Sequence, residues 1–209
     1  MRAVAISVWQ EAKGCCKWIG KHLLSFSLRV GRIAAKILDL CAFPEMMDLL
    51  WQIIKFNTRS LTSAEEQEAR SVFGKSINYS KVRIDEHSLL SWIGAKIKRC
   101  SGMSVTTFHT INFNRKIRTE AGNSDMKWLI HELAHVVQME YEGSKYLVEA
   151  FHAQVTEGYA YRLGSKPHLC EYNREQQASI VADYYIARSS GGSTAAYDTY
   201  IAELRAGQL

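Results

Sequence analysis

The sequence predicts an α+β protein that is mainly helical, and three observations lead to this fold class. Apolar residues recur at helical spacing over residues 10–56, two later stretches alternate as strands do, and helical patterns return from about residue 125. This order of helices, then strands, then helices is typical of α+β proteins. The chain has 209 residues, which suits one domain with an appendage. We therefore predict a helical arm at 1–58 and a folded domain at 59–209.

The predicted arm is basic and amphipathic. Residues 1–36 contain seven basic residues and one acid, whereas the remainder of the chain is close to neutral. Its apolar positions are spaced alternately four and three apart, which makes one stripe on a helix: Ile19, Leu23, Phe26, Val30, Ile33, Ile37 and Leu40. Two interpretations follow: a helix packed on the body with its basic face in solvent, or a helix that contacts an anionic membrane or a partner.

The charge and cysteine content exclude several classes of protein. The positive charge is confined to the arm, so we expect no nucleic-acid binding by the body. Five cysteines without C-x-x-C spacing indicate reduced thiols. No cleavable signal peptide is recognisable, and Arg29, Arg32 and Lys36 interrupt the most apolar window, residues 22–41. We predict a protein that is cytoplasmic in the producing cell and, if exported, leaves without a cleavable signal.

The first elements follow from local signals. Pro44 should break the long helix, and Met46–Phe56 should form a second one. A third helix should begin at a Thr62 or Ser63 cap and end near Phe73, before Gly74.

Two strands are predicted before the central helix. Tyr79–Ile84 alternates in polarity, and Thr106–Asn114 is rich in β-branched and aromatic residues. Three helices complete the chain, over about Asp125–Tyr141, Asn173–Arg188 and Thr194–Leu204. Asn173 and Gln176 form the sequence pattern of a capping box at the start of the second of these helices.

One motif within the helix at Asp125–Tyr141 indicates chemistry. His131 and His135 stand four residues apart, so both imidazoles project from one helix face and can reach one zinc ion. Glu132 lies between them, where it can take a proton from a water bound to that zinc. The flanking residues are apolar and contain no Gly or Pro, as a buried helix requires. The HExxH pattern therefore predicts a site for one zinc ion per chain, with Glu132 as the catalytic base.

This helix resembles the active-site helix of the zincin metallopeptidases. In that superfamily an antiparallel edge strand precedes the helix and holds the substrate, and Thr106–Asn114 could match it. Several segments are more narrowly similar to a bacterial zincin-like family associated with type VI secretion, Vgr/Rhs and contractile-injection loci. These segments are Phe73–Ile84, His131–Gln138, Tyr159–Leu163 and Tyr172–Tyr185. The resemblance covers about residues 60–190 and implies a zincin-like fold with a small sheet whose edge strand precedes the HExxH helix.

Catalytic zinc usually has three protein ligands, so a third is expected. No histidine follows at metzincin spacing, which favours a carboxylate from a later helix, as in gluzincins. Glu175 is preferred because it falls in the first turn of the Asn173–Arg188 helix and shares a face with the small Ser179. Three alternatives remain open: Glu149, Glu157 and Asp183.

Two further roles are predicted on the same helix. Asp183 is a candidate to accept the free N–H of a ligating imidazole and so fix its tautomer. Tyr184, or its neighbour Tyr185, is a candidate to donate a hydrogen bond to the oxyanion of the reaction.

The predicted activity is that of a zinc-dependent metallopeptidase, a hydrolase acting on a peptide or protein. The resemblance implies a secreted effector or toxin with a secretion-apparatus or immunity partner. The arm at 1–58 then serves delivery or contacts an anionic membrane. The alternative is a non-catalytic secretion accessory or cargo module with a structural or vestigial zinc site.

Overall fold

The computed structural model describes the backbone of residues 2–55 and 57–209. It describes the side chains of residues 20, 22–42, 46, 48–51, 53–55 and 57–209. The side chains of Lys13, Lys17 and Lys21, which contribute to the predicted basic arm, lie outside this description, as does residue 56 at the end of the second predicted helix. In the part of the chain that is described, no helix is both long and apolar enough to cross a membrane.

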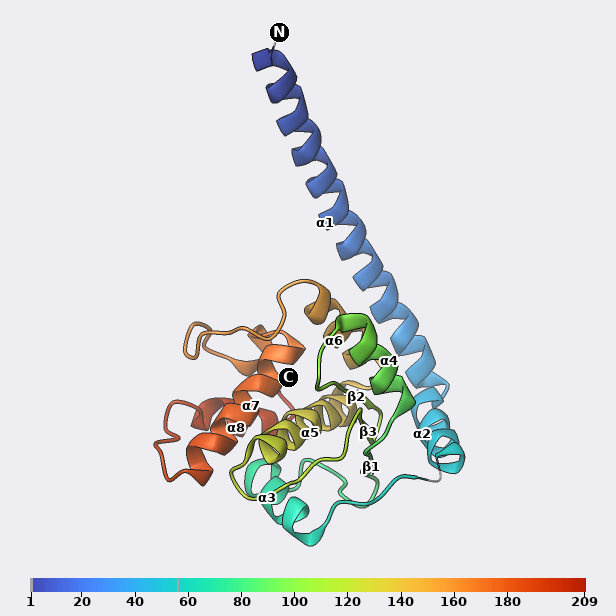
Figure 1. Cartoon of the computed structure of the whole chain (residues 1–209), viewed down its shortest axis with the longest axis vertical. Helices are drawn as coiled ribbons and strands as arrows, with labels where there is room; N and C mark the ends of the chain where they lie inside the picture. Colours follow the sequence, from blue (N-terminus) through green and yellow to red (C-terminus); the bar gives the residue numbers. More distant parts are fainter. Residues whose placement is uncertain (1, 56) are drawn as a thin grey trace.

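The architecture is mainly helical with one small sheet, as the sequence predicts. The helices are α1 (Arg2–Leu40), α2 (Phe43–Ile54), α3 (Ser63–Phe73), α4 (Leu89–Lys98), α5 (Ser124–Glu142), α6 (Lys145–Val155), α7 (Arg174–Ser189) and α8 (Asp198–Arg205), with a 3₁₀ turn at Leu169–Glu171. Helix α5 runs through the centre of the molecule, with α7 and α8 on one side and the sheet and α2 on the other (Figure 1). The N-terminal half of α1 projects beyond the body.

The two N-terminal helices are separated at Ala42, two residues before the predicted break. Ala42 adopts a left-handed conformation with φ of 51°, and Pro44 stands in the first turn of α2. Proline is tolerated there because the first backbone N–H groups of a helix have no intrahelical acceptor. Pro44 therefore begins α2 rather than ending α1.

The sheet has three strands in the order β1-β3-β2. Strand β1 (Arg83–Asp85) runs parallel to β3 (Thr110–Phe113), and β2 (Ser104–Thr107) pairs antiparallel with β3. The prediction of one strand over Thr106–Asn114 is wrong, because the chain turns at Phe108, where φ is 55°. The strand that directly precedes the HExxH helix, β3, is consequently central, and β1 and β2 are the edge strands.

The predicted strand at Tyr79–Ile84 is also too early. Its first residues form a turn, closed by a hydrogen bond from the Val82 amide to the Tyr79 carbonyl, and only its end joins the sheet. The caps are confirmed, because Thr62 with Glu65 and Asn173 with Gln176 both form complete capping boxes. Two short helices, α4 and α6, have no counterpart in the prediction.

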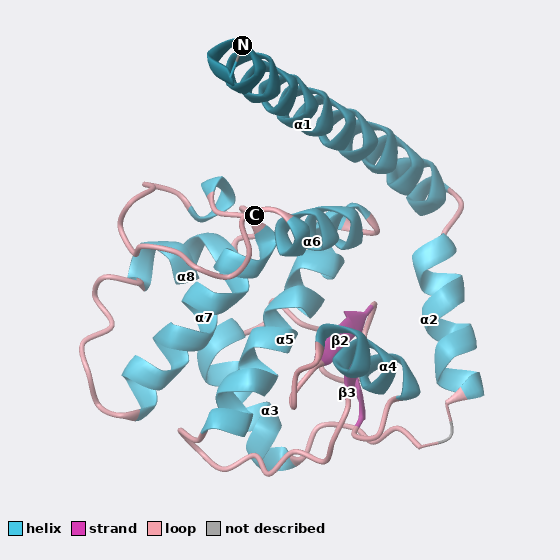
Figure 2. Cartoon of the chain, turned by 45° about the horizontal axis from the view of Figure 1, so that its top comes forward, coloured by secondary structure: helices cyan, strands magenta, loops and turns pink. Residues whose placement is uncertain are grey.

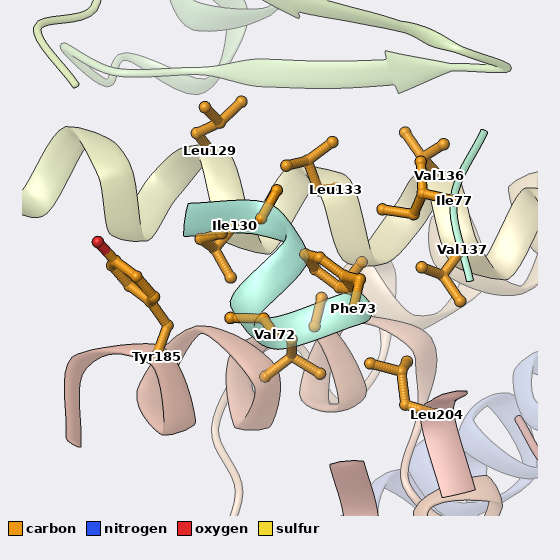
Figure 3. Packing of buried hydrophobic residues seen from close by; sticks show 14 of the residues in the cluster. Val72, Phe73, Ile77, Leu129, Ile130, Leu133, Val136, Val137, Tyr185 and Leu204 are labelled. Atoms are coloured by element: carbon orange, nitrogen blue, oxygen red, sulfur yellow. The ribbon is translucent and has the colours of Figure 1, made fainter. Parts of the chain in front are cut away.

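The core lies on both sides of α5. Leu129, Leu133 and Val136 point from α5 toward the sheet, whereas Ile130 and Val137 point toward α3 (Figure 3). All five side chains are fully buried. In Figure 2 the strands lie between α5 and α2, so the sheet forms a thin layer against one face of the central helix. Burial on two faces fixes the rotation of α5 and therefore the direction of the side chains on its remaining face.

Candidate metal centre

Helix α5 presents the two motif histidines on the face that is not occupied by core residues. His131 and His135 lie one turn apart, with ring centroids separated by 5.1 Å and ring planes at 84°. His135 is buried and His131 is partly exposed. Because Leu133 and Ile130 are locked in the core, the imidazoles have one direction available, toward α7.

Helix α7 supplies the third group, Glu175. Its carboxylate is buried, with Oε2 at 3.3 Å from Nε2 of His131 and 3.3 Å from Nε2 of His135. The candidate ligand atoms of the three residues all lie within 4.8 Å of one another. Two imidazoles and one carboxylate match the ligand set of a catalytic zinc site with an open fourth position. The structure thus brings together the three residues that the sequence preferred as ligands.

The electrostatics of the three groups are strongly coupled. Burial alone would lower the pKa of His135, but the charge and hydrogen bond of Glu175, the charge of Glu132 and the hydrogen bond with Gln138 together raise it to about 9. Burial alone would raise the pKa of Glu175, but both histidines hold it well below its ordinary value. A buried carboxylate that stays charged attracts a cation. A metal ion that binds here would replace the protons that the histidines otherwise carry.

A glutamine network fixes the ring of His135. Its Nδ1 lies 2.8 Å from Oε1 of Gln138, which can only accept, so Nδ1 carries the proton and Nε2 is left for a metal. Gln138 in turn donates to the Arg174 carbonyl and to Gln177 in α7. The sequence predicts Asp183 for this role, whereas in the structure the group beside Nδ1 of His135 is Gln138, three residues later in the same helix.

Asp183 lies at the edge of the site. Its carboxylate is 2.6 Å from the amine of Lys127 and accepts a hydrogen bond from the hydroxyl of Tyr161. Within the described part of the chain, Asp183 forms no hydrogen bond or ion pair with His131 or His135.

The two other alternative ligands, Glu149 and Glu157, are also engaged elsewhere. Glu149 forms ion pairs with Arg32 of α1 and Arg174 of α7, at 2.7 and 2.6 Å. Glu157 is exposed and accepts a hydrogen bond from Asn173. Of the four carboxylates considered, the structure therefore places Glu175 beside both histidines.

Glu132 is held by the edge strand. Its two carboxylate oxygens accept hydrogen bonds from Ser104 Oγ at 2.6 Å and Thr106 Oγ1 at 2.7 Å, both on β2. The indole N–H of Trp128 donates to Ser104 Oγ and orients that hydroxyl. Each carboxylate oxygen keeps a second lone pair, so Glu132 is fixed in place while it can still accept a proton. Ser104 and Thr106 stand two residues apart, which on a strand places both side chains on the same side of the sheet. The predicted strand begins at Thr106 and leaves Ser104 out, so the sequence does not predict this pair.

A cleft of about 1030 Å³ opens onto the three candidate ligands and Glu132. Much of its wall is apolar and aromatic, including Met103, Val105, Trp128, Phe151, Tyr159 and Ala160. Such a cleft, with a few convergent polar groups at one place, is the usual form of a ligand or substrate site.

Three tyrosines line this cleft, Tyr146, Tyr159 and Tyr161, and neither Tyr184 nor Tyr185 is among them. Tyr159 lies 5.9 Å from the ring of His131, centroid to centroid, and burial together with the charges of Glu175 and Glu132 raises the pKa of its phenol. Burial and the same carboxylates raise the pKa of Tyr146, whose hydroxyl donates to the Thr106 carbonyl. Tyr184 packs in the core against Tyr197. The hydroxyl of Tyr185 accepts a hydrogen bond from the Gly122 amide.

Comparison with known proteins gives two related matches. No family model matches the chain. A curated protein, the type VI secretion system spike protein VgrG2b of Pseudomonas aeruginosa, is 31% identical over 156 residues, which is 70% of this chain. The match spans only 15% of that protein's length. A solved structure, the effector domain of Pseudomonas aeruginosa VgrG2b, matches with a TM-score of 0.53 and 29% identity, covering 67% of this chain and 79% of that one.

Proposed function

We propose that this chain is a secreted effector whose body is a zinc-dependent metallopeptidase of the zincin type, linked to type VI secretion. The observation that carries the proposal is the convergence of His131, His135 and Glu175 at a cleft that also contains Glu132. The similarity to the effector domain of a spike protein supports the secreted role and an association with the secretion apparatus.

The residues present fit a zinc ion. His131 and His135 would bind through Nε2 and Glu175 through a carboxylate oxygen, with Gln138 holding the ring of His135. When bound, zinc supplies a Lewis acid that lowers the pKa of a water molecule and polarises a carbonyl. The cleft leaves the site open on one side, as a catalytic centre requires, whereas a structural zinc site is normally closed.

Glu132 is the base in this proposal. It would accept a proton from the attacking water on one carboxylate oxygen and deliver it to the leaving amine. Ser104 and Thr106 hold the carboxylate of Glu132 in a fixed position in the cleft through both proton transfers.

Tyr159 is the hydroxyl best placed to stabilise the oxyanion of a peptide-bond hydrolysis. It lies in the cleft beside His131, and its raised pKa keeps it protonated and able to donate. We propose Tyr159 for the role that the sequence assigned to Tyr184.

The substrate would be an extended peptide. Strand β2 is an edge of the sheet and lines the cleft, so a peptide can pair with it as an added strand. The Tyr146 hydroxyl already occupies the Thr106 carbonyl, which limits this pairing to the part of the strand before Thr106.

The test is a comparison of Glu132→Gln with the parent chain. The variant should bind zinc as the parent does, because Glu132 is not a ligand, but lose peptide hydrolysis by a factor of about 10²–10⁴. Zinc content by elemental analysis and cleavage of a peptide library are the measurements. Glu157→Gln, an exposed carboxylate that does not line the cleft, is the matched control. Full activity in Glu132→Gln would refute the mechanism.

A further inference from the structure

Helix α2 buries a polar residue against the body. Asp48 is buried and lies 2.8 Å from the ring of His109, and the amine of Lys55 lies 2.6 Å from Asp85. The opposite side exposes a row of large apolar residues at the helical spacing i, i+3, i+4, i+7 and i+8. They are Met46, Leu49, Leu50, Ile53 and Ile54, each between 41% and 65% exposed. This orientation is the reverse of an ordinary surface helix, which turns its apolar stripe inward.

Helix α4 has the same orientation. Its buried residues are small, Ser91 and Ala95, and Ser91 donates to the Asn112 carbonyl of β3 at 2.6 Å. Its large apolar residues are exposed: Leu89, Leu90, Trp92, Ile93 and Ile97. The C-terminus of α2 lies beside the N-terminus of α4, because the Lys55 amine is 3.3 Å from the hydroxyl of Ser88, the residue that precedes α4.

The C-terminal part of α1 repeats the pattern. It meets α6 through Ala35, which is buried, through Asp39, which accepts from the Ser144 amide, and through Arg32, which pairs with Glu149. It exposes the stripe that the sequence identified, including Leu23, Phe26, Val30, Ile33 and Ile37. Helix α1 packs against α2, so three neighbouring helices, α1, α2 and α4, carry outward apolar faces. We call them the outer helices.

The exposed charge on the outer helices is basic. Among their described side chains, the exposed charged residues are Arg29, Arg32, Lys36, Lys96 and Lys98, and Arg99 directly follows α4. The two acids in the same set, Asp39 and Asp48, point to the body and are engaged there. The ammonium of Lys96 lies 5.6 Å from the ring centre of Trp92, so a cation and an aromatic ring stand together on this surface.

We propose that the outward faces of α1, α2 and α4 dock onto an anionic lipid surface. An exposed apolar area of this extent marks an interaction site, and its basic border complements acidic headgroups. A second copy of the chain would bring the same basic residues against each other, which opposes self-association. The outer helices expose their apolar residues along their outward faces, so they would lie in the interface with Trp92 at the headgroup level.

The experiment measures partition of the full chain onto vesicles. Vesicles of phosphatidylcholine alone are compared with vesicles that contain phosphatidylglycerol in equal parts. We expect binding to the anionic vesicles at least about tenfold stronger than to the neutral ones. Raising the salt should weaken it, because the Debye length falls from about 10 Å at 0.1 M to about 3 Å at 1 M.

Two paired variants separate the apolar and the charged contributions. Leu49→Ser with Ile53→Ser should lower the partition onto anionic vesicles about tenfold or more, because two aliphatic groups lose their burial in the lipid. Lys36→Gln with Lys96→Gln should lower it about tenfold and leave binding to neutral vesicles unchanged. Val155→Ser, an exposed apolar residue of α6 outside the outer helices, is the control and should bind as the parent does.

Three results would overturn the proposal. The first is no binding to anionic vesicles, and the second is equal binding to both vesicle types. The third is a parent chain that does not bind vesicles but sediments as a dimer, together with a Leu49→Ser, Ile53→Ser variant that sediments as a monomer. The last result would assign the surface to a second copy. None of these readouts depends on peptide hydrolysis, so the docking surface and the proposed peptidase can fail independently.

Discussion

The central helix α5 and the outer helix α2 use their amphipathic sequences in opposite ways. Helix α5 buries Leu129, Ile130 and Leu133 and turns the polar groups of the site toward a cleft. Helix α2 buries Asp48 and exposes Leu49 and Ile53. Helix α5 is held by apolar packing, whereas the buried residue of α2 among its described side chains is Asp48, which pairs with His109. The comparison shows that an apolar stripe in a sequence predicts a helix face that will be buried. The stripe itself does not show whether that face is buried against the rest of the same chain or against a partner.

The largest predicted effect breaks the packing of α5. Leu133→Ala should lower the free energy of unfolding by about 2–5 kcal/mol, because it opens a cavity between the central helix and the sheet. Chemical denaturation of the two proteins measures the change. Leu133→Met, which keeps the volume, should cost less than about 1.5 kcal/mol. A loss below 1 kcal/mol in the alanine variant would contradict the assignment of α5 as the core helix.

Zinc should stabilise the two helices of the site and leave α2 unaffected. At a free concentration about 100-fold above its dissociation constant, zinc adds about 2.7 kcal/mol to the free energy of unfolding. Hydrogen exchange should slow in α5 and α7 and stay the same in α2. His135→Ala should remove both effects. Equal protection by zinc in that variant would show that the ion binds somewhere else.

The attachment of α2 should depend on pH through His109. Burial alone would lower its pKa, but hydrogen bonds to Asp48 and Glu140 raise it from 6.5 to about 9. A raised pKa in the folded state means that the stabilisation is fully present below pH 6.5 and disappears as the pH rises through about 9. His109→Gln should therefore cost about 2 kcal/mol near pH 6 and far less above pH 9. Unfolding curves of both proteins across this range provide the test, and a pH-independent difference would contradict it.

The smallest predicted effect is at the exposed face of α2. Leu49→Ala should change the free energy of unfolding by no more than about 0.5 kcal/mol, because the side chain is 62% exposed. The same denaturation experiment applied to Leu133→Ala and Leu49→Ala compares the two helices directly. A large loss at Leu49 would mean that this face is already covered in the isolated chain.

The sequence predicts best the elements whose signals are local. The helix that carries His131 and His135 was placed at Asp125–Tyr141 and spans Ser124–Glu142, and the helix of Glu175 begins at the predicted Asn173 cap. Both have strong caps and an uninterrupted apolar pattern. These two helices bring the three candidate ligands together, so local sequence signals were sufficient to predict which residues form the candidate metal centre.

Tertiary pairing was harder to predict. The turn at Phe108 contains neither glycine nor proline, and the residues around it favour strands, so one long strand was expected instead of the β2–β3 hairpin. The contacts of Ser104 and Thr106 with Glu132 depend on that hairpin and could not be found without it. The outward orientation of α2 depends on Asp48 meeting His109, a contact between residues 61 positions apart that spacing cannot reveal.

The contact between His135 and Glu175 has a consequence for how this site can change during evolution. The two residues are 40 positions apart, so their contact closes a long loop that contains α6 and the cleft residues Tyr159–Tyr161. The entropy of closing a flexible loop grows slowly with its length, by about 0.6 kcal/mol for each doubling. Insertions and deletions between α6 and α7 therefore cost the site little. The wall of the cleft around Tyr159–Tyr161 can therefore change in length without separating the three candidate ligands, but such a change would move Tyr159 from the place proposed for it beside His131.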